Sequence, residues 1–122
     1  MRPIDQTKHE RTGQRGNCLA AALASILEIQ INEVPAFEEM APGAWKEELF
    51  EWCAARGYLV VREQATLNLD EAYVLVGISE AGCRHAVVAS AGIIVHDPHH
   101  LRLGLKTPEY ALRLIPHDVV YA

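Results

Sequence analysis

Long hydrophobic runs are absent from this sequence: none of its apolar stretches approaches the roughly 18–20 residues that span a bilayer. The first residues, Met1–Gln6, lack the hydrophobic segment of a secretory signal, so we expect a chain that is not exported. Cysteine is scarce, and its count of three cannot pair completely within one chain. An odd thiol favours a reducing compartment, which predicts a cytoplasmic protein.

Basic residues are also few. Eleven Lys and Arg stand against 16 Asp and Glu, which gives a net charge of −5 at pH 7. Proteins that bind duplex nucleic acid usually present a basic face, so the charge argues against such a partner. Half of the 122 residues are apolar, which excludes a disordered chain. We therefore expect a single domain over 1–122, without a nucleic-acid or membrane partner; no prediction follows for its oligomeric state.

The apolar periodicity changes half-way along the chain. Before Gly57 it indicates helices, one expected over 17–28 and a second over 44–56, with a short helical turn at 31–35 between them. After Gly57, short runs rich in β-branched and aromatic residues indicate strands. The expected strands are 58–61, 72–78, 84–89, 93–96 and 110–115. Helices followed by an antiparallel sheet predict an α+β fold.

Cys18 is the first candidate for chemistry, because it lies in the first turn of the helix expected over 17–28. Backbone N–H groups at a helix N-terminus carry partial positive charge, which favours the thiolate, and they can hold an oxyanion. A buried and inert cysteine is the alternative interpretation. The polar, glycine-containing segment before Cys18 favours a nucleophile.

His85 and Asp97 are the candidates for a base and for the group that orients it. His85 opens the apolar strand expected over 84–89, and Asp97 follows the strand expected over 93–96. If Ser90-Ala91-Gly92 turns the chain, the two residues lie about equally far from the turn and become cross-strand neighbours. A thiolate enzyme needs such a base and partner. A surface His and an Asp-Pro turn are the alternatives.

Five stretches between residues 5 and 100 carry a resemblance to a known family. They are Asp5-Gln6-Thr7, Gly16-Asn17-Cys18-Leu19-Ala20-Ala21-Ala22-Leu23-Ala24-Ser25-Ile26-Leu27, Glu33-Val34-Pro35, Arg84-His85-Ala86-Val87-Val88 and Val95-His96-Asp97-Pro98-His99. A helical Cys, then a His on a strand, then an Asp near the next strand resembles the papain-like cysteine peptidases. Among these, the chain is most similar to small bacterial and phage-type members akin to the bacteriocin-leader (double-glycine) peptidases.

The resemblance implies a fold and a reaction. The helix that carries Cys18 would pack on an antiparallel sheet that carries His85 and Asp97, and the three would hydrolyse a peptide or another amide through an acyl-enzyme, without a metal or an organic cofactor. It also implies a Gln before the Cys whose amide donates to the oxyanion. Gln6 is favoured because Asp5-Gln6-Thr7 resembles the pattern of the small members; Gln14 is the alternative.

Other residues that could carry chemistry have simpler interpretations. His96, Asp97, His99 and His100 form a His-rich tract, but a zinc site needs ligands from a second cluster, and the sequence does not indicate one. Cys53 and the two Trp residues are expected in the core, and Cys83 is the second candidate nucleophile. Glu38 and Glu39 are expected on a solvated loop.

Three activities fit these residues. A cysteine peptidase that acts on a peptide or protein substrate is the main prediction. Deamidation or acyl transfer to an amine shares the acyl-enzyme and is a second. A binding or adaptor module that keeps the fold without turnover is a third, because so short a chain leaves little material for substrate subsites.

Overall fold

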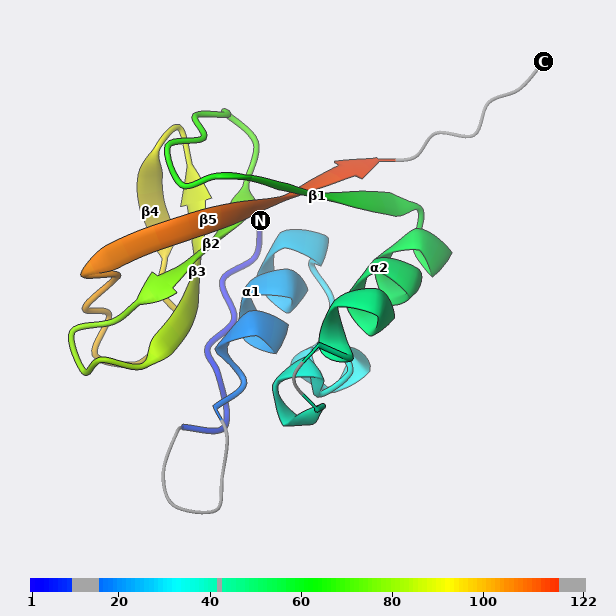
Figure 1. Ribbon diagram of the computed structural model, residues 1–122, viewed down its shortest axis with the longest axis horizontal. Helices are drawn as coiled ribbons and strands as arrows, with labels where there is room; N and C mark the ends of the chain where they lie inside the picture. The colour runs from blue at the N-terminus through cyan, green and yellow to red at the C-terminus, as the bar shows by residue number, and fades with distance from the viewer. Residues whose placement is uncertain (10–15, 42, 117–122) are drawn as a thin grey trace.

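The protein is described here by a computed structural model that covers residues 1–9, 16–41 and 43–116 (Figure 1). Its helical elements precede its strands, as the change in periodicity predicts. In chain order they are α1 (Cys18–Leu27), the 3-10 turns η1 (Ile31–Glu33) and η2 (Phe37–Glu39), α2 (Trp45–Ala55), β1 (Tyr58–Gln64), β2 (Tyr73–Ile78), β3 (Arg84–Ser90), β4 (Ile93–His96) and β5 (Thr107–Pro116). The predicted α+β class is confirmed.

The strands form one five-stranded antiparallel sheet in the order β1-β5-β2-β3-β4. The last strand of the chain, β5, lies between β1 and β2, and in Figure 1 it crosses the front of the molecule. β5 is longer than the expected strand over 110–115 because it pairs with two neighbours, Tyr58–Gln64 on one side and Val74–Ile78 on the other.

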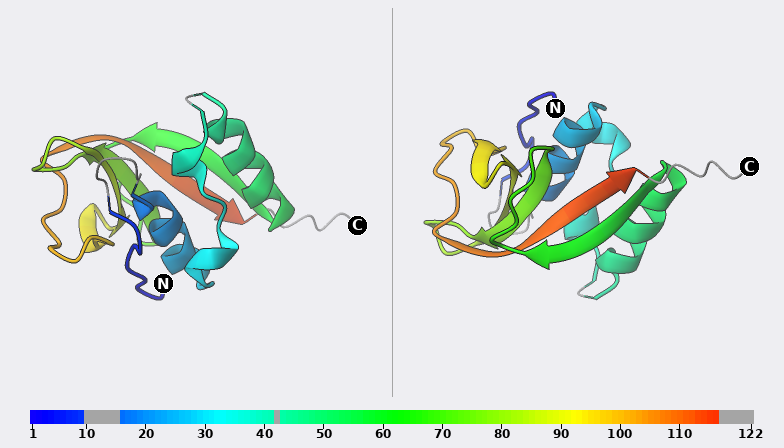
Figure 2. Two further views of the ribbon diagram at one scale, coloured as in Figure 1. Left: turned by 90° about the horizontal axis from the view of Figure 1, so that it is seen from below. Right: turned by 90° about the horizontal axis from the view of Figure 1, so that it is seen from above.

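Apolar clusters lie on both faces of the sheet. On one face, α1 packs against β2 and β3, α2 packs against β1, and the strands contribute Val74, Val76, Ala86, Val88, Leu112 and Leu114. Figure 2 shows α1 and α2 beside the twisted sheet from two directions. The alternating residues form the second cluster with the loop that follows β1: Tyr73, Leu75, Val87, Ala89 and Ala111. Burial on both faces explains why the central strands are continuously apolar.

The α1 helix is almost entirely buried, which accounts for its small residues. Ala20, Ala21, Ala22 and Ala24 are each 3% exposed or less, and Leu23 is 1% exposed. Ala favours the helix intrinsically and lets β3 approach closely. The helix ends at Leu27, and Glu28 follows in the left-handed conformation with φ 57°. No helix among the described residues is long and apolar enough to cross a membrane.

A glycine allows β2 and β5 to approach each other at the end of the sheet that holds the candidate site. The pairing shifts register between Val76 and Gly77, which marks a bulge. A Cβ atom on Gly77 would lie 2.2 Å from the carbonyl oxygen of Thr107. Only glycine fits there, and Gly77 is the residue that pairs with His85 across the ladder.

The β3–β4 hairpin turns where the sequence predicts. Ala91 and Gly92 both have positive φ, 53° and 75°, the conformation of a tight two-residue hairpin turn. The strand pairing differs from the expected one, in which His85 and Asp97 lie equally far from the turn. The register shifts between Val88 and Ala89, and the pairing ends at Val88 opposite His96. His85 and Asp97 are therefore not partners in the ladder: Asp97 lies in the loop after β4.

Candidate active site

Cys18 is the first residue of α1, as predicted, and its sulfur lies against the edge of β3. The backbone N–H of Ala86 donates to Cys18 Sγ at 3.4 Å. β4 pairs with β3 only from Val88 to Ser90, so this part of the β3 edge is open to α1. Because β4 is short and its pairing stops at Val88, the N-terminus of α1 can contact β3 at this point.

The segment before Cys18 is tied to the start of α1 by one side chain. Asn17 precedes the helix, but its side chain caps none of the helical N–H groups. Its Oδ1 accepts the N–H groups of Thr7 at 2.9 Å and Lys8 at 2.8 Å, and its Nδ2 donates to Thr7 Oγ1. Asn17 therefore fixes residues near Gln6 beside the candidate nucleophile.

Glu38 caps α1, so the expectation that it is solvated is wrong. Its Oε2 accepts the N–H of Leu19 at 2.8 Å and of Ala20 at 3.2 Å. Burial raises the pKa of this carboxyl although these hydrogen bonds favour the ionised form. Among the described residues, no hydrogen bond is made by the N–H of Cys18, which stays available to a ligand.

His85 and Asp97 lie in direct contact, with His85 Nε2 2.7 Å from Asp97 Oδ1. Both are buried, at 9% and 5% exposed. Asp97 also accepts the backbone N–H of His99 on Oδ1 at 2.9 Å and that of Gly104 on Oδ2 at 2.7 Å. Burial alone would raise the pKa of Asp97, but these three donors lower it overall. The carboxylate is therefore ionised and fixed in position.

A second carboxylate and an arginine support the loop that carries Asp97. Arg102 donates to both carboxylate oxygens of Asp5, each at 2.9 Å, and it also donates to the Asp97 carbonyl. The hydrogen bond from Arg102 lowers the pKa of Asp5. On the same side, His96 Nε2 lies 2.8 Å from the Ile4 carbonyl oxygen. The first residues of the chain are thus joined to the 97–102 loop by the two-pronged Arg102–Asp5 ion pair.

His85 is charged at neutral pH. Burial lowers its pKa, but the hydrogen bond to Asp97 and the interactions with Cys18 raise it, and the net result is a pKa of about 9 against an ordinary 6.5. Because Nε2 of His85 is held by Asp97, Nδ1 is the nitrogen left for Cys18. The arrangement favours an imidazolium between Cys18 and the Asp97 carboxylate.

Gln6 lies in the same pocket, while Gln14 lies outside the described residues. Gln6 is 8% exposed and its backbone N–H donates to the Pro98 carbonyl at 3.0 Å. Its side-chain Nε2 donates to the Lys8 carbonyl at 2.8 Å, and its Oε1 is buried without a partner. An amide nitrogen carries two hydrogens, so Gln6 Nε2 has a second N–H besides the one bonded to Lys8, in a pocket that Cys18 also lines.

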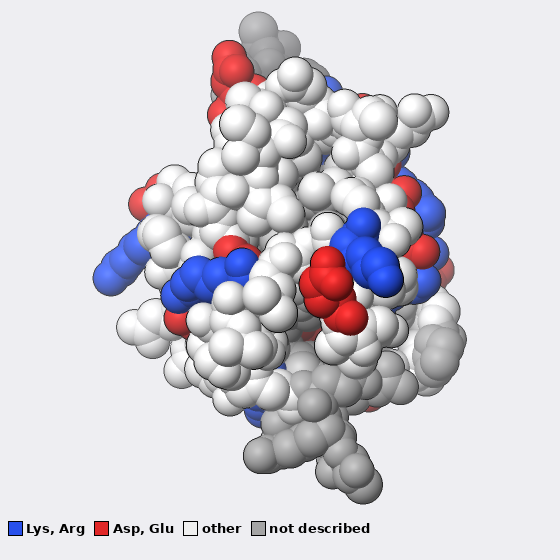
Figure 3. All heavy atoms as spheres, turned by 90° about the vertical axis from the view of Figure 1, so that its left-hand side faces the viewer, with Lys and Arg blue, Asp and Glu red and all other residues white. Residues whose placement is uncertain are grey.

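A pocket of about 450 Å³ joins these groups, and its lining is mostly apolar. The residues that line it beside Cys18, His85 and Gln6 include Leu19, Phe37, Met40, Trp45, Leu101, Leu103 and Tyr110. Leu101 and Leu103 are 59% and 64% exposed at its rim. Figure 3 views the side that holds their loop, where most of the surface comes from residues other than Lys, Arg, Asp and Glu. Such a pocket suits an apolar group.

The other cysteines take the places expected of them. Cys53 is fully buried in α2, and burial raises its pKa to about 11, which makes it a poor nucleophile. Cys83 is exposed in the loop before β3 and lines the pocket. The two Trp residues pack on the larger core cluster while remaining partly exposed.

The His-rich tract divides between two places. His96 contacts Ile4 and Asp5, away from the pocket. His99 and His100 lie beside His9 from the start of the chain. No sequence spacing connects His9 to this tract, just as none connects Glu38 to Cys18, and for that reason the sequence did not indicate either residue.

We expect Asp97→Asn to lower both the stability of the fold and the turnover. The loss of turnover should be smaller than the loss caused by His85→Ala. The three partners of Asp97 all donate hydrogen bonds, whereas an amide offers one acceptor oxygen and places an NH₂ against a donor. An unsatisfied buried donor costs about 1–3 kcal/mol of unfolding free energy. Thermal unfolding and kcat measure the two effects, with exposed Asp70→Asn as the control. An unchanged melting temperature would contradict this account of the loop.

Comparisons of the chain with protein-family models, with curated proteins and with solved structures find no match.

Proposed function

We propose that the protein is a papain-like cysteine hydrolase of peptide or other amide bonds. One observation carries the proposal: Cys18 at a helix N-terminus interacts with His85, which Asp97 holds at 2.7 Å, at the wall of a 450 Å³ pocket. A nucleophile, a base and an orienting group in this relation are the parts of covalent acyl transfer. The residues come from α1, β3 and the loop after β4, far apart in sequence.

The reaction uses each group once in each half. Cys18 Sγ attacks the substrate carbonyl and forms a C–S bond, while the N–H of Cys18 and the amide of Gln6 donate to the oxyanion. The C–N bond then breaks, and His85 gives its proton to the leaving amine. In the second half, His85 takes a proton from water, the resulting hydroxide attacks the thioester, and Cys18 leaves. Asp97 keeps the imidazole in one orientation throughout.

Iodoacetamide labelling at pH 6 tests the proposal. We expect Cys18 to be alkylated first, because a helix N-terminus and a neighbouring imidazolium make a thiol more reactive than an ordinary one. Peptide mapping identifies the labelled site, and exposed Cys83 in the same pocket is the internal control. Preferential labelling of Cys83, or equal slow labelling of both, would overturn the assignment of the nucleophile.

Hydrolysis is expected to fall above a pH of about 9, the pKa of His85. Loss of the proton removes the acid for the leaving amine, whereas alkylation of Cys18 needs no acid and continues. The raised pKa of His85 also stabilises the fold. This stabilisation is fully present below pH 6.5, the ordinary pKa, and is lost as the pH rises through about 9. Rates of ester and amide hydrolysis, alkylation and thermal unfolding between pH 6 and 10 separate these effects. An alkylation rate that falls together with hydrolysis would contradict this role of His85.

Deamidation or transfer of the acyl group to an amine uses the same first half-reaction. In acyl transfer an amine replaces water at the thioester, whereas in deamidation water attacks and the leaving group is ammonia. Mass analysis separates the outcomes: acyl transfer incorporates an added amine, deamidation leaves the peptide chain uncut, and peptide hydrolysis cuts it. A binding module without turnover would instead hold the substrate and release it unchanged, with Cys18 unlabelled at pH 6.

A further inference from the structure

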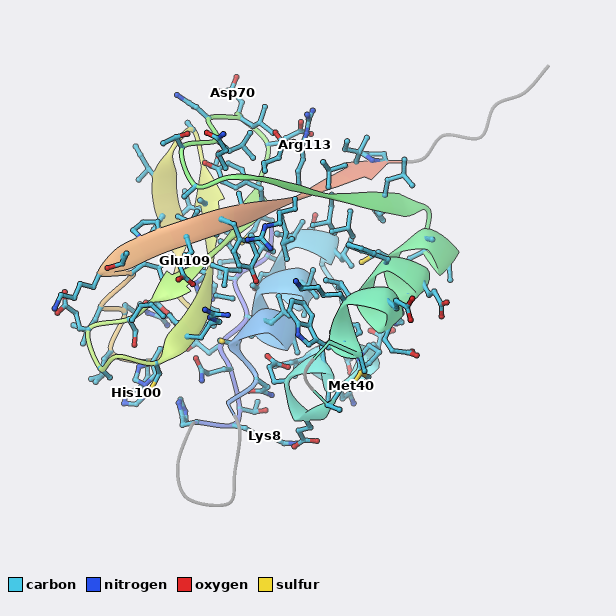
Figure 4. The ribbon with its side chains drawn as sticks, in the orientation of Figure 1. Lys8, Met40, Asp70, His100, Glu109 and Arg113 are labelled. Atoms are coloured by element: carbon cyan, nitrogen blue, oxygen red, sulfur yellow. The ribbon has the colours of Figure 1, made fainter. Side chains whose placement is uncertain are left out.

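Three histidines meet at the edge of the pocket. His9 precedes the Cys18 helix, and His99 and His100 follow Asp97. One ring nitrogen from each of them lies within 4.8 Å of those of the other two. The His99 and His100 rings stack at 4.5 Å between centroids, and the His9 ring meets both edge-on at 5.0 and 5.2 Å. Figure 4 labels His100 at the end of the molecule where β3 begins.

We propose that His9, His99 and His100 bind a zinc ion beside the active site. Imidazole nitrogens are preferred zinc ligands, and three of them leave a fourth position for water or substrate. The sequence did not indicate a ligand from a second segment, and the fold places His9 there. The site is separate from the Cys18–His85–Asp97 group.

A contact of His99 must open when zinc binds. The N–H of Leu101 donates to Nδ1 of His99 at 3.1 Å. Zinc on Nδ1 displaces this N–H directly, and zinc on Nε2 moves the ring proton to Nδ1, where the N–H can no longer donate. In either case the Leu101 amide is released, which makes it a local reporter of binding.

Zinc at this site would also act on the proposed hydrolase. His9 and His99 both line the pocket, and the His99 ring lies 6.3 Å from that of His85. A bound ion would join the segment that carries Gln6 to the loop that carries Asp97, and would occupy the pocket wall. We expect zinc to inhibit hydrolysis; this part alone rests on the proposed function.

Binding is tested first, on a protein that cannot hold zinc through its pocket thiols. Zinc chloride is titrated into the Cys18→Ala/Cys83→Ala protein at pH 7.5 against a chromophoric chelator. We expect one ion per chain and a shift of the Leu101 amide resonance. His100→Gln and His9→Gln should each lower the affinity at least roughly tenfold, because even the loss of an outer-shell partner costs 10–100-fold. His96→Gln, which retains a donor for the Ile4 carbonyl, should leave the affinity unchanged.

Two other outcomes of the titration overturn the zinc site. Zinc binding that requires Cys18 would place the ion on the Cys18–His85 pair. Binding that survives both His9→Gln and His100→Gln in folded protein, checked by circular dichroism, would place it elsewhere. Inhibition is then measured with the unsubstituted protein and with His100→Gln, whose basal hydrolysis should be normal. Zinc binding without any hydrolysis to inhibit would sink the proposed function and leave the metal site intact.

Discussion

Cys18→Ala is expected to abolish hydrolysis and leave the fold unchanged. Removing a covalent nucleophile lowers turnover by roughly 10⁴-fold or more, because the remaining groups have no bond to form with the carbonyl. Alanine is the best helix former, and Cys18 is only partly buried at the first position of α1. The initial rate of hydrolysis of the p-nitrophenyl ester of an N-blocked amino acid measures the loss. The melting temperature confirms the fold.

Two further variants make this result specific. Cys83→Ala removes an exposed thiol from the same pocket and should leave the rate unchanged. His85→Gln should lose nearly as much activity as Cys18→Ala, while its amide still donates to Asp97 and limits the damage to the fold. Residual ester hydrolysis at the wild-type rate in Cys18→Ala would exclude Cys18 as the nucleophile.

Gln6→Ala is expected to lower kcat by roughly 10²–10³-fold with little change in KM, the effect of losing one oxyanion donor. The oxyanion exists only in the transition state and the intermediate, so substrate binding is spared. The lost hydrogen bond to the Lys8 carbonyl should cost about 1 kcal/mol of unfolding free energy. Steady-state kinetics on the same ester separate kcat from KM.

The matched controls for Gln6 are a second glutamine and a near-isosteric change. Gln14→Ala alters the same residue type in the same part of the chain and should be nearly silent. Gln6→Glu keeps the volume but replaces the N–H donor with a carboxylate oxygen, so it should be at least as slow as Gln6→Ala. A strong defect in Gln14→Ala with none in Gln6→Ala would make Gln14 the oxyanion donor instead of Gln6. Normal turnover in every variant would show that no glutamine side chain donates to the oxyanion.

Much of this site could be predicted because its parts depend on local sequence. The helical periodicity after Asn17 placed Cys18 at a helix N-terminus, and the observed helix begins at that residue. The strand that opens near His85 and the turn at Ala91 and Gly92 follow from side-chain preference and backbone conformation. Such features extend over a few residues, and the chain specifies them before it folds.

Other parts were decided by tertiary structure. The expected cross-strand pairing of His85 with Asp97 is replaced by a loop contact, because the ladder shifts register and ends at Val88. Arg102 and the N–H of Gly104 then fix that loop on Asp97.

By itself, then, the sequence determined the α+β class, the helix that starts at Cys18 and the hairpin that follows His85. Only the tertiary structure brought Glu38 to the start of α1 and His9 to His99 and His100. Both contacts join segments that no periodicity relates. They form because burying the two faces of the sheet brings those segments together. At the start of α1, the partly buried Glu38 then finds partners in the N–H groups of Leu19 and Ala20.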